Sequence, residues 1–192
     1  QMCIRDRYED LSRLKEEPLL MRKTQEVLLR TTGMKFHGGI KVNHLLHVLV
    51  DEIGLDKVSQ KVRNPINFRI AGFYGPNMQQ EGACGGDDVY DPQYLEQLID
   101  ALGGEPVQWE SRTQSVGVPG LFAEEATVLR QIASTIDDAK SEGASIIVSA
   151  CTLSHTALDI YQGKASRSTG LSTNIPVIHL SEFLAFAFGH YN

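Results

Sequence analysis

From Phe68 to the end of the chain, short apolar runs alternate with longer segments whose apolar residues recur at helical spacing. Residues 144–150 form a mainly apolar segment with three consecutive β-branched side chains, as in a buried strand. The pattern predicts strands at 68–74, 107–109, 144–150 and 176–180, and helices at 92–102, 122–142, 152–162 and 181–188. Because parallel strands are joined by helical crossovers, this order predicts an α/β fold with a Rossmann-like, mostly parallel sheet and helices on both faces.

Local signals mark where some of these elements begin and end. Asp91 is a typical N-cap residue for the helix at 92–102, and Gly103 would end that helix. Residues 164–174 are rich in Ser, Thr and Gly, so we expect them to form a polar surface loop.

Before Pro65 the sequence predicts helices only. An amphipathic helix is expected up to about Gly33, and a second one from Val42 to Ile53. A short third helix is expected before Pro65. Residues 8–64 are therefore interpreted as a helical segment and residues 65–192 as the α/β domain.

The first seven residues have neither helical periodicity nor the apolar run of a secretory signal. We interpret residues 1–7 as a non-native leader. On this interpretation Cys3 has no function and the natural protein extends further upstream.

Charge and cysteine content exclude several classes of protein. The net charge of -6 and the pI near 5.5 argue against a nucleic-acid-binding protein, which would need clustered Lys and Arg. No apolar stretch approaches the roughly 20 residues of a membrane helix, although docking on a membrane partner stays open. Three cysteines without a pairing pattern favour a reducing, cytoplasmic location over a disulfide framework.

Three loops are expected to follow the carboxyl ends of predicted strands. They are Tyr74-Gly75-Pro76, Ser115-Val116-Gly117 and the segment from Ala150 to His155. Because loops at the carboxyl ends of parallel strands gather at one edge of the sheet, we expect Pro76, Ser115 and Cys151 to converge there.

These loops resemble the cysteine-rich (CCG) domain of the heterodisulfide-reductase-B-like family, which is named after the B subunit of heterodisulfide reductase. In that family a strand is followed by Tyr-Gly-Cys, and then by Cys-Cys-Gly and Cys-x-x-Cys at similar spacing. The corresponding positions here are Pro76, Ser115 with Val116, and Cys151 with Ser154. Residues 38–46, 157–159 and 175–184 add further likeness, and the resemblance to the C-terminal half of such subunits covers about residues 8–190.

The resemblance implies a subunit of an electron-transfer oxidoreductase, of the heterodisulfide reductase or succinate dehydrogenase/fumarate reductase kind, with iron–sulfur or flavin subunits as partners. It also implies that residues 8–64 form an inter-domain segment. The vestigial cluster positions are Pro76, Ser115, Val116, Cys151 and Ser154. Because iron–sulfur clusters are held by thiolates, no cofactor is expected in this fragment, and the cluster would belong to a missing N-terminal domain. The fragment is expected to be a cluster-free scaffold and docking module rather than a catalyst.

Two alternatives remain open from the residues themselves. Cys151 and His155 are one helical turn apart, and with Cys84 from a Gly-rich acidic loop they could bind a metal ion or a small thiol. Each of these residues also has an ordinary structural interpretation, as a buried cysteine, a helix histidine or an exposed thiol. The chain could also be a purely structural interaction protein.

Overall fold

The computed structural model describes the chain except for residues 1, 79–85 and 191–192. It divides into two compact units, residues 1–44 and residues 45–192. Cys84, one of the candidate metal ligands, lies outside the described residues.

The first unit contains two helices, α1 (Met2–Glu16) and α2 (Pro18–Thr32). The single amphipathic helix expected up to Gly33 is therefore divided at Pro18, which lacks a backbone N–H and starts a new helix more readily than it continues one. Gly33 ends α2 as expected, with a left-handed φ of 72° and its N–H bonded to Leu29 O. Helix α1 begins at Met2, although the first seven residues lack helical periodicity in the sequence; their non-native origin stays a prediction.

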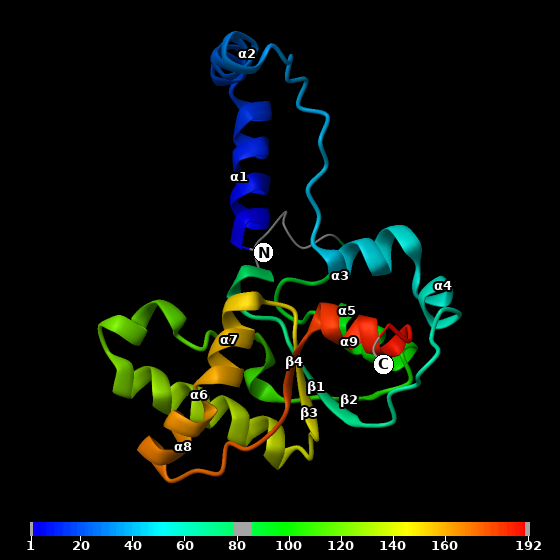
Figure 1. Cartoon of the computed structure of the whole chain (residues 1–192), viewed down its shortest axis with the longest axis vertical. Coiled ribbons are helices and arrows are strands. Elements are labelled where there is room, and N and C mark those ends of the chain that lie inside the picture. Colours follow the sequence, from blue (N-terminus) through cyan, green and yellow to red (C-terminus); the bar gives the residue numbers. More distant parts are fainter. Residues whose placement is uncertain (1, 79–85, 191–192) are drawn as a thin grey trace. The chain divides into compact units, whose positions relative to one another are not determined.

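The second unit is built on a four-stranded, all-parallel sheet (Figure 1). Its strands are β1 (Arg69–Phe73), β2 (Glu105–Val107), β3 (Ile146–Ser149) and β4 (Val177–His179), and their order is β2-β1-β3-β4. Phe73 pairs with Ser149, and Ser149 with His179, so the carboxyl ends of the three strands lie level. The predicted α/β fold with a parallel sheet is confirmed.

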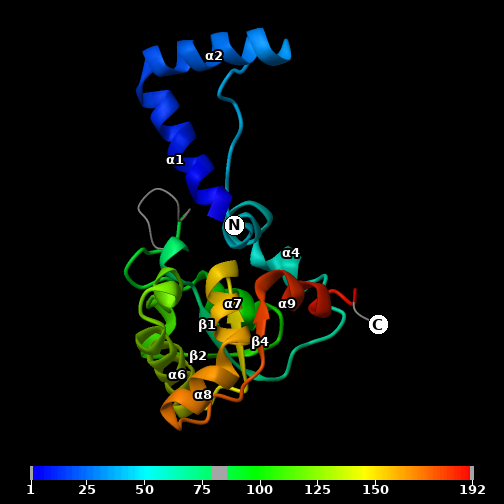
Figure 2. The same cartoon turned by 60° about the vertical axis from the view of Figure 1, so that its left-hand side comes forward.

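Helices cover both faces of the sheet, as predicted (Figures 1 and 2). The helices α6 (Glu125–Ser141), α7 (Thr152–Ile160) and α8 (Gln162–Thr169) lie on one side, and α5 (Tyr94–Ala101) and α9 (Leu180–Ala187) lie on the other. Alternate residues of a strand face opposite cores: Ile70 belongs to the core under α5 and α9, and Ala71 to the core under α6.

Shorter helical turns complete this unit. The segment before the sheet contains α3 (Leu45–His47), a π-helical stretch (Val48–Ile53) and α4 (Leu55–Ser59). Three 3₁₀ turns follow, η2 (Pro76–Met78), η3 (Glu110–Thr113) and η4 (Val118–Phe122). None of the helices in the described part of the chain is long and apolar enough to cross a membrane.

The prediction of a polar loop at 164–174 was wrong for its first half, because those residues belong to helix α8, which follows α7 directly. Ala165 is the only residue of α8 that is buried, and it packs into the core beside α6. A helix with one small buried side chain has no repeating apolar pattern in its sequence. The formation of α8 therefore depends on tertiary packing and could not be predicted from local sequence.

Two other element ends differ from the prediction. Strand β2 ends at Val107, and Trp109 instead donates a hydrogen bond from Nε1 to Gly72 O at 3.0 Å. The N-cap residue of α5 is Gln93 and not Asp91, and the Asp87 carboxylate accepts the backbone N–H groups of Gln93 and Tyr94 at 2.8 and 3.1 Å.

Candidate functional site

A small cavity lies where the chain leaves β1 and β3, and all five predicted vestigial positions line it. We call it the strand-end cavity. Its volume is about 100 Å³, and its lining residues are Pro76, Ser115, Val116, Val118, Pro119, Cys151, Leu153 and Ser154. The loops after the two central strands and the loop that leads into η4 therefore meet at the carboxyl edge of the sheet.

Gly75 lets the loop after β1 approach the start of α7 closely. Its φ is +73°, and a Cβ added there would lie 2.8 Å from Ser154 Oγ and 2.9 Å from Cys151 Cβ. Both the left-handed backbone and the short distances require glycine. The loop that carries Pro76 is therefore packed tightly against the start of α7.

Cys151 is the N-cap residue of α7 and its side chain is 4% exposed. Ser149 Oγ donates to Cys151 O at 3.0 Å and accepts a hydrogen bond from Cys151 N–H at 3.3 Å, which holds the turn between β3 and α7. Ser154, one turn into the helix, is also buried. The thiol and the hydroxyl therefore face the cavity from a fixed backbone.

The loop that carries Ser115 and Val116 is held by its own polar groups. Ser115 Oγ accepts the N–H of Gly117 at 3.2 Å, and Ser115 O accepts a hydrogen bond from Gln131 Nε2 at 2.6 Å. Val116 is buried and supplies apolar volume to the core beneath.

The residues around the strand-end cavity do not fit an iron–sulfur cluster. Clusters are ligated by cysteine thiolates, and of the five positions only Cys151 carries a thiol. Pro76 and Val116 have no side-chain donor atom. The volume of about 100 Å³ is also well below the roughly 300–1,000 Å³ of pockets that hold small molecules.

A buried polar network lies beside the cavity and was not foreseen from the sequence. Tyr74 donates its hydroxyl hydrogen to the Glu96 carboxylate and accepts the N–H of Leu95 at 2.8 Å. Arg112 Nη1 donates to Glu96 Oε1 at 3.1 Å, and Arg112 O accepts the N–H of Tyr74 at 2.9 Å. Arg112 also pairs with Asp91. The network ties the loop after β1 to α5 and η3.

Burial perturbs the acid–base behaviour of this network. Burial raises the pKa of Glu96, and the hydrogen bond from Tyr74 opposes that rise. Burial, followed by the negative charge of Glu96, raises the pKa of Tyr74 far above its ordinary value. The phenol therefore stays a hydrogen-bond donor. No sequence signal pairs Tyr74 with Glu96, because the two residues are brought together only by packing α5 on β1.

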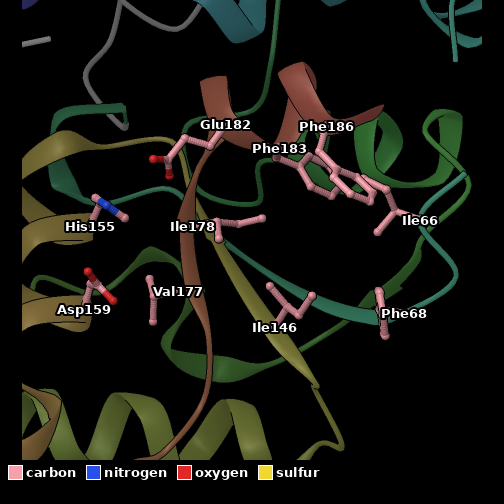
Figure 3. A pocket seen from close by; sticks show the side chains of 10 residues that line it. All are labelled: Ile66, Phe68, Ile146, His155, Asp159, Val177, Ile178, Glu182, Phe183 and Phe186. Carbon is pink, nitrogen blue, oxygen red and sulfur yellow. The ribbon is translucent and has the colours of Figure 1, made fainter. Parts of the chain in front are cut away.

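A second, larger cavity lies along β4, between α7 and α9 (Figure 3). We call it the β4 groove. Its volume is about 530 Å³, and it is lined by Ile66, Phe68, Ile146, His155, Asp159, Val177, Ile178, Glu182, Phe183 and Phe186. Figure 3 shows the three polar side chains on one side of the groove and the aromatic side chains on the other.

The predicted metal pair is not brought to one cavity. Cys151 lines the strand-end cavity, whereas His155 lines the β4 groove, where its ring makes an edge-to-face contact with His179 at 5.8 Å. In the described ranges, 2–78 and 86–190, no group of three or more His, Cys, Asp or Glu side chains is arranged to hold a metal ion.

Comparison with curated proteins finds distant relatives among reductase subunits. The chain is 29% identical over 159 residues to the 8-methylmenaquinol:fumarate reductase membrane anchor subunit of Wolinella succinogenes, covering 82% of this chain and 55% of that protein. It is 26% identical over 183 residues to the B subunit of the ferredoxin:CoB-CoM heterodisulfide reductase of Methanosarcina mazei, covering 92% and 59%. A heterodisulfide-reductase-B-like protein of Archaeoglobus profundus is 24% identical, with 97% and 64% covered.

These relatives support the predicted resemblance to the B subunit of heterodisulfide reductase at a coarse level, and their names describe subunits of reductases. The chain spans 55–64% of the length of these three relatives. No family model matches the sequence. A crystal structure of a hypothetical protein from Helicobacter pylori has a similar fold, with a TM-score of 0.66, 16% identity, and coverage of 95% of this chain and 32% of that one.

Proposed function

We propose that this chain is the C-terminal half of a heterodisulfide-reductase-B-like subunit in an electron-transfer oxidoreductase complex. Its α/β unit acts as a cluster-free scaffold that docks iron–sulfur or flavin subunits. The iron–sulfur chemistry belongs to another domain of the longer subunit. The observation that carries the proposal is the strand-end cavity: the five positions matched to the family's cysteines surround one small cavity, and a single thiol remains among them.

The replacements explain how the unit keeps its fold without a cluster. An empty polar cavity would destabilise the protein, because buried polar groups need partners and voids lose packing contacts. Val116 fills volume, Pro76 restricts its loop and Ser115 bonds to the following backbone. The result is a rigid surface at the sheet edge in place of a redox centre.

The proposed docking surface adjoins the strand-end cavity at η4. Val118 and Pro119 line the cavity, and Phe122 at the end of the same turn is fully exposed, at 100% of its reference area. An aromatic side chain held entirely in water gains much from burial at an interface, where aromatic residues are enriched. Phe122 is therefore the side chain on which docking should depend most.

The test is isolation of the tagged full-length subunit from its source organism under anaerobic conditions. We expect iron–sulfur or flavin proteins to co-purify with it, and Phe122→Ser to reduce their yield several-fold. Ile160→Ser, which changes another exposed apolar residue on α7, is the matched control and should leave the yield unchanged. Purification without any iron–sulfur or flavin protein would refute the proposal.

A further inference from the structure

We propose that the β4 groove is a binding site for a small apolar molecule with a positively charged, hydrogen-bond-donating head, such as a hydrophobic amine. The groove and the strand-end cavity share no lining residue. The proposed ligand site is therefore independent of the proposed scaffold function, and each can be tested without the other.

Size and lining favour a small organic ligand. The volume of about 530 Å³ lies within the roughly 300–1,000 Å³ typical of ligand pockets. Seven of the ten lining residues are apolar, and Phe183 and Phe186 lie together beside Ile66 (Figure 3). Phe68 and Phe186 are about half exposed, so a bound apolar body would remove aromatic surface from water.

The opposite side of the groove carries negative charge. Asp159 comes from α7 and Glu182 from α9, and the groove lining contains no Lys or Arg. Glu182 Oε2 accepts the N–H of His179 at 3.0 Å, which fixes the carboxylate at the start of α9. Neither carboxylate forms a salt bridge with a basic side chain in the described part of the chain. Two unneutralised carboxylates favour a cationic head and disfavour an anionic one.

His155 also lines this side of the groove. Its Nδ1 is buried and has no partner among the described residues. This atom is enclosed by the protein, so it is not a contact for a ligand head in the groove, and the head would instead meet the two carboxylates. The edge-to-face contact with His179 holds the imidazole ring between α7 and the end of β4. A ligand would therefore lie with its cationic head near Asp159 and Glu182 and its apolar body toward Phe186.

The inference can be tested with three probes that share one apolar body: 4-phenylbutylamine, 4-phenylbutan-1-ol and 4-phenylbutanoate. Affinities for the whole chain are measured by isothermal calorimetry, and the site is located by NMR chemical-shift changes. The amine should bind at least about tenfold more tightly than the carboxylate, a difference of one decade in Kd. The alcohol should fall between them.

Three variants separate the contributions of head and body. Asp159→Asn combined with Glu182→Gln should remove most of the preference for the amine while leaving alcohol binding unchanged, because each amide keeps a hydrogen-bond acceptor. Phe186→Ala should weaken all three probes alike. Asp137→Asn, which removes one exposed carboxylate from α6, is the matched control and should change nothing. Equal affinity for amine and carboxylate, no measurable binding of any probe, or binding that ignores Phe186→Ala would overturn the proposal.

Discussion

Tyr74 at the end of β1 donates a hydrogen bond to the buried carboxylate of Glu96 on α5. The same phenol accepts the backbone N–H of Leu95, so one side chain links the central strand to the first turn of the helix. Because Gly75 and Pro76 follow directly, this link also sets where the loop at the strand-end cavity begins.

Removing the phenol should destabilise the protein. Tyr74→Phe removes one of the two side-chain donors to Glu96 and leaves Leu95 N–H without its acceptor, and a buried group that loses its partner costs about 1–3 kcal/mol. Urea denaturation followed by circular dichroism measures the loss. Tyr90→Phe is the control, because Tyr90 is 87% exposed. Equal midpoints for the two variants would show that the network contributes no stability.

Gly75→Ala should also destabilise the α/β unit. Its positive φ alone costs a non-glycine residue about 1–3 kcal/mol, and the new Cβ would press against Ser154 Oγ and Cys151 Cβ. Gly163→Ala in α8 is the matched control, since its Cβ would make only an ordinary contact, at 3.5 Å, and alanine favours a helix by roughly 0.5–1 kcal/mol. Thermal unfolding of both variants gives the comparison. Similar behaviour of the two alanines would contradict the close fit between the loop after β1 and the start of α7.

Anaerobic reconstitution with iron and sulfide should give no stable chromophore with the natural sequence, because four of the five cavity positions lack a thiolate. The variant that combines Pro76→Cys, Ser115→Cys, Val116→Cys and Ser154→Cys should bind iron at least partly, if the loops keep the geometry of a cluster site. Iron content and visible absorbance after identical treatment measure the difference.

Two outcomes of that reconstitution would contradict the vestigial-site interpretation. Near-zero iron in a four-fold variant that is still folded by circular dichroism would mean that these loops are not a vacated cluster site. A stoichiometric cluster in the natural chain that Cys151→Ser abolishes would mean that the remaining cysteines bind a cluster elsewhere.

Stability should fall on mild acidification because of His179. Burial, followed by the positive charge of His155, lowers the pKa of His179 in the folded protein. The unfolded chain, with a histidine pKa of about 6.5, binds the proton first, so stability is full above that value and decreases as the pH falls toward the folded pKa. Burial also lowers the pKa of His47, so protonation of His47 should reduce stability over the same pH range.

The variant that isolates this effect is His179→Asn. Asparagine still caps α9, where the histidine side chain accepts the N–H of Ser181, but it cannot titrate. Unfolding free energies measured from pH 7.5 to 5.5 should therefore depend less on pH than in the natural chain. His37→Asn, at an exposed histidine, should not alter the slope. An unchanged slope in His179→Asn would rule out His179 as the source.

The positions in the strand-end cavity could be proposed from sequence because they depend on a simple geometric rule. Pro76 and Cys151 each follow a recognisable strand, and parallel strands place such ends at one edge of the sheet. The β4 groove could not be proposed in this way. Its lining residues come from strand, helix and loop positions between Ile66 and Phe186, and no local pattern marks them as neighbours.

The sequence by itself determined the α/β class, the helices on both faces of the sheet and the convergence of three loops, because apolar periodicity is a property of residues close together in the chain. Only the tertiary structure decided that α8 is a helix, that Asp87 rather than Asp91 accepts backbone N–H groups at the start of α5, and that Tyr74, Glu96 and Arg112 form one network. The helix α8 and the Tyr74 network rest on contacts between residues distant in sequence, and the Asp87 contact depends on how the loop before α5 folds. A buried alanine or a hydrogen-bonded carboxylate stabilises the fold through its partner, and the partner is specified only once the chain has packed.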